Sequence, residues 1–275
     1  MTFLSRTFGA AAFGMLSALT ALTALPAQAQ FVSADEVVQV SLLPGYRLDG
    51  NRHMAAIRIR LAPGWKTYWR APGEGGVPTV LRLTQAEGVS GMAIHWPRPQ
   101  VFFANGLRAI GYEGDVILPL EFTLDGDGVA SIAGQLDLGV CQEVCMPISV
   151  NLSGVLPQTT TRDGTIAAAL ADRPLTASEA GAGAVTCAVV PIADGLRVTV
   201  RAQVPDAGND ETLVVEHRDP MIWVSEAASQ RDGGWITGVA DVVPADSGPF
   251  AMNRSDLRIT VIGSRMAVEL SRCTG

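Results

Sequence analysis

The chain has 275 residues, of which 48% are hydrophobic and 17% are charged, and its formal net charge at pH 7 is −7. This acidic balance argues against a nucleic-acid partner, because binding nucleic acid requires a basic surface. The length is too great for one small sandwich and favours two domains. The sequence has no phosphate loop and no Ser-His-Asp arrangement at motif spacing, so it does not indicate a nucleotide enzyme or a hydrolase.

Residues 1–29 have the organisation of a secretory signal peptide. Arg6 precedes a run of small and apolar residues, which ends at Pro26 and Ala27-Gln28-Ala29. A basic start, an apolar middle and an A-x-A exit are the three parts of such a signal. We therefore expect cleavage after Ala29, with an uncleaved membrane anchor as the alternative. Export would allow the four cysteines to form two disulfides.

Short segments of alternating apolar and polar residues follow, separated by Gly, Pro, Asn and Asp. This alternation is typical of half-buried strands, and many short strands with turn residues between them indicate an all-β sandwich. The segments are 53–62, 79–84, 115–124, 128–140, 196–204, 212–217, 221–227, 235–243 and 257–263. We predict an all-β fold of two immunoglobulin-like β-sandwich domains in tandem.

Residues 163–174 are the one segment with a helical composition. They are rich in Ala, begin at Asp163-Gly164 and end before Pro174. The small and polar residues that follow suit a linker. We therefore expect the signal peptide at 1–29, a first domain at 30–158, a helix and linker at 159–182, and a second domain at 183–275.

Two cysteines, Cys141 and Cys145, lie close together in LGVCQEVCMP (138–147). A disulfide needs its Cα atoms about 4.4–6.8 Å apart, whereas four residues of extended strand cover about 13 Å. The chain must therefore turn, and we predict a hairpin with Gln142-Glu143-Val144 as its loop. The alternation places both thiols on the less apolar face of their strands, where partners can reach the bond.

The residues around this pair leave its role open. A bridge around three residues constrains the unfolded chain little, so a hairpin staple would stabilise weakly. A zinc or copper site is another alternative, with His95 as a further ligand. Because Glu143 lies in the loop and no Lys, Arg or His does, we do not expect highly activated thiols.

Five segments together resemble the N-terminal, periplasmic domain of the thiol:disulfide interchange protein DsbD, including its ScsB-like branch. They are QFVSADEVV (30–38), PGWKTYWRAPGEGG (63–76), WPRPQVFF (96–103), GYEGDVILPL (111–120) and LGVCQEVCMP (138–147). The resemblance implies an immunoglobulin-like domain whose cysteine pair passes reducing equivalents. It assigns Cys145 as the nucleophile that forms mixed disulfides and Cys141 as the resolving thiol.

The resemblance also implies residues around the pair. Phe102 and Phe103 occupy the place of a short cap loop that shields the cysteines, and Tyr68 matches an aromatic residue that lines the site. Ordinary core packing is the alternative for these rings. Arg70 and Glu74 follow on a Pro- and Gly-rich loop, where they could line the rim of the site.

The implied partners are a membrane-embedded thiol reductase, DsbD- or CcdA-like and on a separate chain, and periplasmic thioredoxin-like or isomerase clients. The chain would then be a protein-disulfide reductase component in the periplasm, active in electron transfer without a cofactor. Two other functions stay open. One is periplasmic copper binding or copper tolerance through the same cysteines, and the other is a non-catalytic interaction module with two structural disulfides.

The second domain contains Cys187 on its first predicted strand and Cys273 near the chain end. A disulfide between them would close a long loop and stabilise the domain by about 4–5 kcal/mol. We predict a structural disulfide, with a second redox pair as the alternative. We expect His217 to be hydrogen-bonded scaffold and the domain to be a spacer or docking module.

Overall fold

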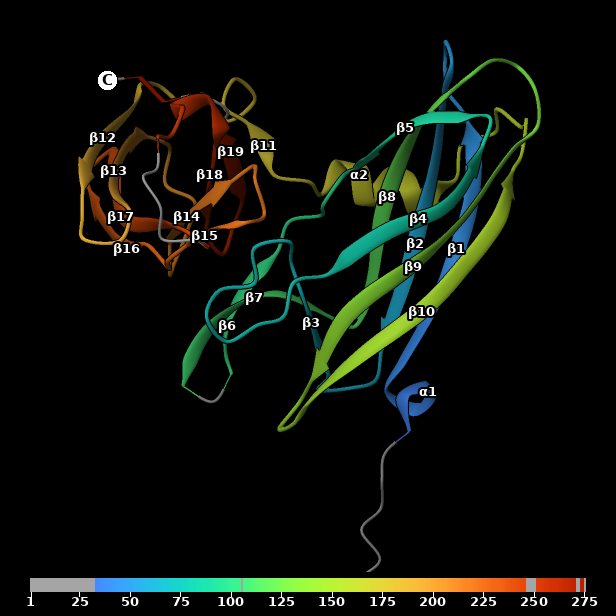
Figure 1. Cartoon of the computed structure of the whole chain (residues 1–275), viewed down its shortest axis with the longest axis horizontal. Helices are drawn as coiled ribbons and strands as arrows, with labels where there is room; N and C mark the ends of the chain where they lie inside the picture. Colours follow the sequence, from blue (N-terminus) through green and yellow to red (C-terminus); the bar gives the residue numbers. More distant parts are fainter. Residues whose placement is uncertain (1–32, 105, 246–250, 271–272, 275) are drawn as a thin grey trace, which may run out of the picture. The chain divides into compact units, whose positions relative to one another are not determined.

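The computed structural model describes residues 33–104, 106–245, 251–270 and 273–274, so the expected signal peptide lies outside the described residues. Strands between residues 38 and 156 form two sheets, and strands between residues 175 and 270 form two more (Figure 1). The predicted all-β fold of two sandwich domains is therefore confirmed. No helix of the described part is long and apolar enough to cross a membrane.

The first sandwich begins with a short helix, α1 (Ala34–Val37), and contains ten strands. These are β1 (Val38–Arg47), β2 (Arg52–Leu61), β3 (Lys66–Tyr68), β4 (Val80–Glu87), β5 (Val89–Ile94), β6 (Gln100–Ala104), β7 (Leu107–Glu113), β8 (Asp115–Leu124), β9 (Ala130–Cys141) and β10 (Cys145–Leu156). One sheet has the order β1-β2-β8-β5. The other has the order β10-β9-β3-β7-β6, and β4 also pairs with β9.

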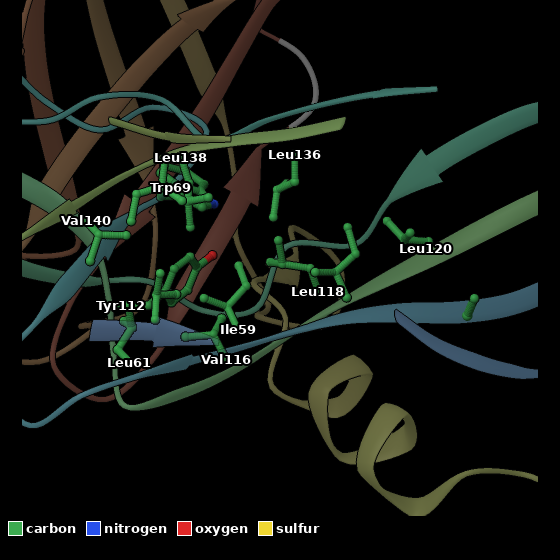
Figure 2. Close-up of a cluster of buried hydrophobic side chains, with 14 of the residues drawn as sticks. Ile59, Leu61, Trp69, Tyr112, Val116, Leu118, Leu120, Leu136, Leu138 and Val140 are labelled. Atoms are coloured by element: carbon green, nitrogen blue, oxygen red, sulfur yellow. The ribbon is translucent and has the colours of Figure 1, made fainter. Parts of the chain in front are cut away.

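The core of this sandwich forms because alternate side chains of each strand point inward. Figure 2 shows Leu136, Leu138 and Val140 of β9 pointing toward Ile59 of β2 and Leu118 of β8. All five side chains are buried in one cluster. The inward face of β9 is therefore used for packing, and Cys141, which has the opposite parity, projects from the outward face.

The predicted helix is present as α2 (Gly164–Ala171). Its first turn is capped by Asp163, whose carboxylate accepts hydrogen bonds from the backbone N–H groups of Thr165 and Ile166. Capping satisfies two backbone donors that a helix start otherwise leaves unpaired. Ile166 is buried against side chains of the first sandwich, including Met54 and Ile117.

The second sandwich also has two sheets, with the orders β11-β19-β18-β14 and β12-β13-β17-β15, and β16 pairs with β17. A 3-10 helix, η1 (Arg254–Asp256), precedes β18. The strands are β11 (Leu175–Thr176), β12 (Val185–Pro191), β13 (Leu196–Gln203), β14 (Thr212–His217), β15 (Ile222–Val224), β16 (Ala228–Asp232), β17 (Trp235–Pro244), β18 (Leu257–Ile262) and β19 (Ala267–Leu270). A disulfide joins Cys187 of β12 to Cys273.

Removing the Cys187–Cys273 bond should destabilise the protein more than removing the hairpin bond. The Cys187→Ser/Cys273→Ser variant loses a bridge between residues 86 positions apart, which the loop-closure model values at about 4–5 kcal/mol. The Cys141→Ser/Cys145→Ser control loses a bridge between residues 4 positions apart, valued at about 2 kcal/mol. Urea unfolding measures both losses, and equal losses or the reverse order would contradict this expectation.

A buried histidine should make the fold sensitive to acid. His53 of β2 has no exposed surface, and its Nε2 donates to the Pro44 carbonyl at 2.6 Å. Burial lowers the pKa of this imidazole below its ordinary value of 6.5. The unfolded chain therefore takes up a proton that the folded chain resists, so stability falls as the pH drops through about 6.5.

The His53→Gln variant should lose this part of the acid sensitivity. The free energy of unfolding, measured by urea titration at pH 7.5 and pH 5.5, should fall less between these values in the variant than in the native protein. An equal fall in both proteins would show that His53 is not the responsible group.

Candidate active site

The chain turns between Cys141 and Cys145 as the spacing predicts. The strands β9 and β10 form a long antiparallel hairpin (Figure 1), in which Cys141 lies directly opposite Cys145. Residues 142–144 form the loop. The two Cα atoms are 4.1 Å apart, and a disulfide joins the side chains.

The two bonded cysteines differ in exposure. Cys145 is exposed at the start of β10, whereas Cys141 has only 3% of its surface exposed. Both lie on the outward face of the sheet, as the alternation predicts, and Cys145 is the more accessible end of the bond. Tyr68, Ala109 and Phe102 form a second, smaller apolar cluster with Cys141 on this face.

The register of β3 explains part of the burial of Cys141. β3 pairs with β9 so that Lys66 lies opposite Cys141 and Thr67 opposite Val140. Directly opposite residues project from the same face of a sheet, and so do residues two apart on one strand. Lys66 and Tyr68 therefore share the face of Cys141. The Thr67 hydroxyl donates to the Gly139 carbonyl at 2.9 Å and fixes this register.

The register of β6 and β7 separates the two phenylalanines. Phe102 lies opposite Ala109, and Tyr68 lies opposite Gly111, two residues further along β7. Phe102 therefore reaches the cysteine face, with its ring centroid 6.1 Å from that of Tyr68. Phe103 projects from the other face and is 70% exposed. Of the two rings expected as a shield, only Phe102 packs against Cys141.

The Tyr68 ring fits a slot that two glycines leave open. A Cβ atom on Gly76 would lie 2.6 Å from Cδ1 of Tyr68, and one on Gly139 would lie 3.3 Å from two ring atoms. The hydroxyl Oη lies 3.6 Å from Sγ of Cys145. Because a disulfide sulfur carries no hydrogen, the hydroxyl is the donor. Burial raises the pKa of this phenol, so it stays protonated at neutral pH.

Other residues named from the sequence lie elsewhere. Arg70 forms ion pairs with Glu216 at 2.9 Å and with Glu269 at 2.8 Å, so it does not line the rim of the cysteine site. Nε2 of His95 is 2.9 Å from Glu121, so this imidazole is not a third ligand beside the cysteines. Within the described ranges, no group of three or more His, Cys, Asp or Glu side chains is placed to hold a metal ion.

Residues 28–157 match the family model described as thiol:disulfide interchange protein DsbD, N-terminal. This segment is therefore similar to the N-terminal domain of that family. The chain is also similar in structure to the N-terminal periplasmic domain of ScsB from Proteus mirabilis, with 25% sequence identity and a TM-score of 0.65. The similarity covers 89% of this chain and 97% of the other, so it extends over both sandwiches. No curated protein gave a significant match.

The match of residues 28–157 to the DsbD N-terminal family supports a thiol:disulfide interchange type of domain, and the similarity to a periplasmic domain supports a periplasmic location. Lys66, Gly76 and Gly139 were not identified from the sequence as parts of this site. The two glycines carry no functional group, and Lys66 is 75 positions before Cys141. Only the strand pairing brings them together.

Removing the Phe102 ring should make Cys141 more reactive. In a Cys145→Ala background, Cys141 is left as a thiol whose reaction with a small disulfide reagent depends on access. Phe102→Ala should increase this rate severalfold at constant pH. Phe103→Ala is the matched control, since it removes an equal ring from the opposite face, and it should leave the rate unchanged. Equal effects of the two substitutions would show that the Phe102 ring does not restrict access to Cys141.

Proposed function

We propose that the chain exchanges disulfides with partner proteins through Cys141 and Cys145. It would relay reducing equivalents from a membrane-embedded thiol reductase, on a separate chain, to periplasmic thioredoxin-like or isomerase clients. The observation that carries this proposal is the unequal exposure of two disulfide-bonded cysteine residues within a segment that matches the DsbD N-terminal family. Cys145 is exposed and available to partners, whereas Cys141 is bonded to it and buried in an apolar cluster.

The exchange has two steps in the direction of client reduction. The Cys145 thiolate attacks a client disulfide, forms a mixed disulfide and releases one client thiolate. The Cys141 thiolate then attacks the Cys145 sulfur, re-forms the bond within the hairpin and releases the second client thiolate. The client gains two electrons and the cysteine pair loses them. A dithiol of the membrane reductase restores the pair by the reverse sequence.

The remaining parts of the chain have supporting roles in this proposal. Residues 1–29 would direct export and be removed, and residues 30–158 would form the redox domain. Residues 159–182 would link it to residues 183–275, a spacer or docking module that the Cys187–Cys273 disulfide stabilises. Cys187 is buried in the core of the second sandwich, which suits a structural bond.

Single-cysteine variants should separate the roles of the two thiols. Cys141→Ala leaves the exposed Cys145 without a resolving partner, so tagged protein exported to a bacterial periplasm should accumulate mixed disulfides. Cys145→Ala leaves only the buried thiol and is the matched control, which should accumulate none. Non-reducing electrophoresis after acid quenching measures both. Equal trapping by the two variants, or no trapping in either, would contradict the proposed roles.

Two measurements distinguish disulfide exchange from a purely structural bond and from copper binding. A purely structural hairpin bond should have a reduction potential below about −300 mV, whereas an exchanging bond should be more oxidising. Equilibration with thiol buffers measures this potential. A copper-binding protein should bind Cu(I) tightly in its reduced form and lose that affinity in Cys141→Ser. Tight binding of this kind would favour copper handling over exchange.

A further inference from the structure

The sheet aligns four side chains in one row across adjacent strands. Cys145 of β10 lies opposite Cys141 of β9, Cys141 lies opposite Lys66 of β3, and Lys66 lies opposite Glu113 of β7. Opposite residues in antiparallel strands have Cβ atoms about 4.5–5.5 Å apart on the same face. The row therefore places a cation one strand away from Cys141, on the side away from Cys145.

The ammonium group of Lys66 is held at the edge of the cluster that covers Cys141. Its Nζ is 2.9 Å from Oε1 of Glu113 and 5.4 Å from the centroid of the Phe102 ring. The Lys66 side chain is only 26% exposed. Contact with an aromatic face and partial burial both keep this charge near the apolar cluster and strengthen its effect there.

Attack on the Cys145 sulfur creates a negative charge on Cys141, which a nearby cation would stabilise. When a partner thiolate attacks Sγ of Cys145, the bond to Cys141 breaks and its electron pair stays on the Cys141 sulfur. That sulfur lies in an apolar cluster, and burial without a compensating charge disfavours a thiolate. The Tyr68 hydroxyl approaches the Cys145 sulfur, which is the atom under attack and not the atom that gains the negative charge.

We propose that Lys66 is the electrostatic partner of Cys141, stabilising the thiolate that leaves when Cys145 is attacked, while Glu113 competes for the same ammonium. This inference rests on the proposed exchange function and adds a residue to its site. In the opposite direction, the same ammonium keeps Cys141 as a thiolate that is ready to resolve a mixed disulfide. No proton needs to move in either step.

The other charged groups on this face are placed less favourably. Glu143 is exposed in the hairpin loop, where water screens its charge. Asp137, four residues before Cys141 on the same face, is paired with Arg82 and accepts from the Ser149 hydroxyl. Lys66 is therefore the cation that the strand pairing places beside Cys141.

The test uses Cys145→Ala protein with the Cys187–Cys273 bond intact, in which Cys141 is left as a thiol. The alkylation rate with iodoacetamide, a neutral reagent, is measured from pH 5 to pH 10. Lys66→Met should lower the rate at pH 7 about tenfold and move the midpoint of the profile to higher pH. Lys66→Arg should restore most of the rate. Glu113→Gln removes the competing carboxylate and should move the midpoint to lower pH.

The plateau at high pH separates charge from packing. There the thiol is fully ionised, so a change in access alone would alter the plateau and leave the midpoint in place. An unchanged midpoint in Lys66→Met, or equal midpoints in Lys66→Met and Lys66→Arg, would overturn the proposal. If Lys66→Met does not fold, the midpoint of the Glu113→Gln profile is the test: a shift to lower pH would support the proposal, and an unchanged midpoint would overturn it. Because no partner protein is used, failure of trapping at Cys145 would count against the exchange function alone.

Discussion

Strand β9 pairs along both of its edges, and the register of this pairing fixes the candidate site. Its inward residues Leu136, Leu138 and Val140 enter the core, where each fully buried side chain stabilises the fold by about 1.5–3 kcal/mol. Its outward residues Gly139 and Cys141 enter the smaller cluster around Tyr68. A slip of one residue would exchange the two sets, so the core packing that stabilises the sandwich also holds the cysteine in place.

The outward cluster makes one disulfide chemically unequal at its two ends. Phe102 and Tyr68 pack around Cys141, whereas Cys145 is exposed to solvent and its sulfur is approached by the Tyr68 hydroxyl. A symmetric staple at the hairpin end would need neither the buried tyrosine nor the two glycines that make room for its ring. Glycine is costly within a strand because it adds backbone entropy to the unfolded state and packs poorly. Gly139 lies within β9, where a Cβ atom would lie 2.9 Å from Cβ of Val77 and 3.3 Å from two ring atoms of Tyr68, so the close approach of these two side chains explains its presence.

Patterns local to the sequence predicted nine of the strands, the hairpin and the helix, because each depends on residues close together in the chain. Other strands, among them β5, β6, β7 and β19, were not predicted. The strand β1 was missed because Pro44 and Gly45 interrupt its alternation, and its register shifts between Leu43 and Tyr46. Phe102 and Phe103 project from opposite faces, and which of them shares the face of Cys141 depends on the pairing of Phe102 with Ala109. No local pattern specifies this pairing. No local pattern specifies the position of Lys66 beside Cys141 either, because it depends on the pairing of the three-residue strand β3 with β9.

The electrostatics of the site follow from strand register more than from neighbours in the chain. Taken alone, the loop suggests unreactive thiols, because Glu143 is its one charged residue. That carboxylate is exposed, however, and charges surrounded by water interact weakly. The Lys66 ammonium lies against the Phe102 ring, where the lower local dielectric makes a single charge count for more. A cation held by strand pairing therefore outweighs an anion held by the loop, and an acidic chain can present a local environment that favours a thiolate.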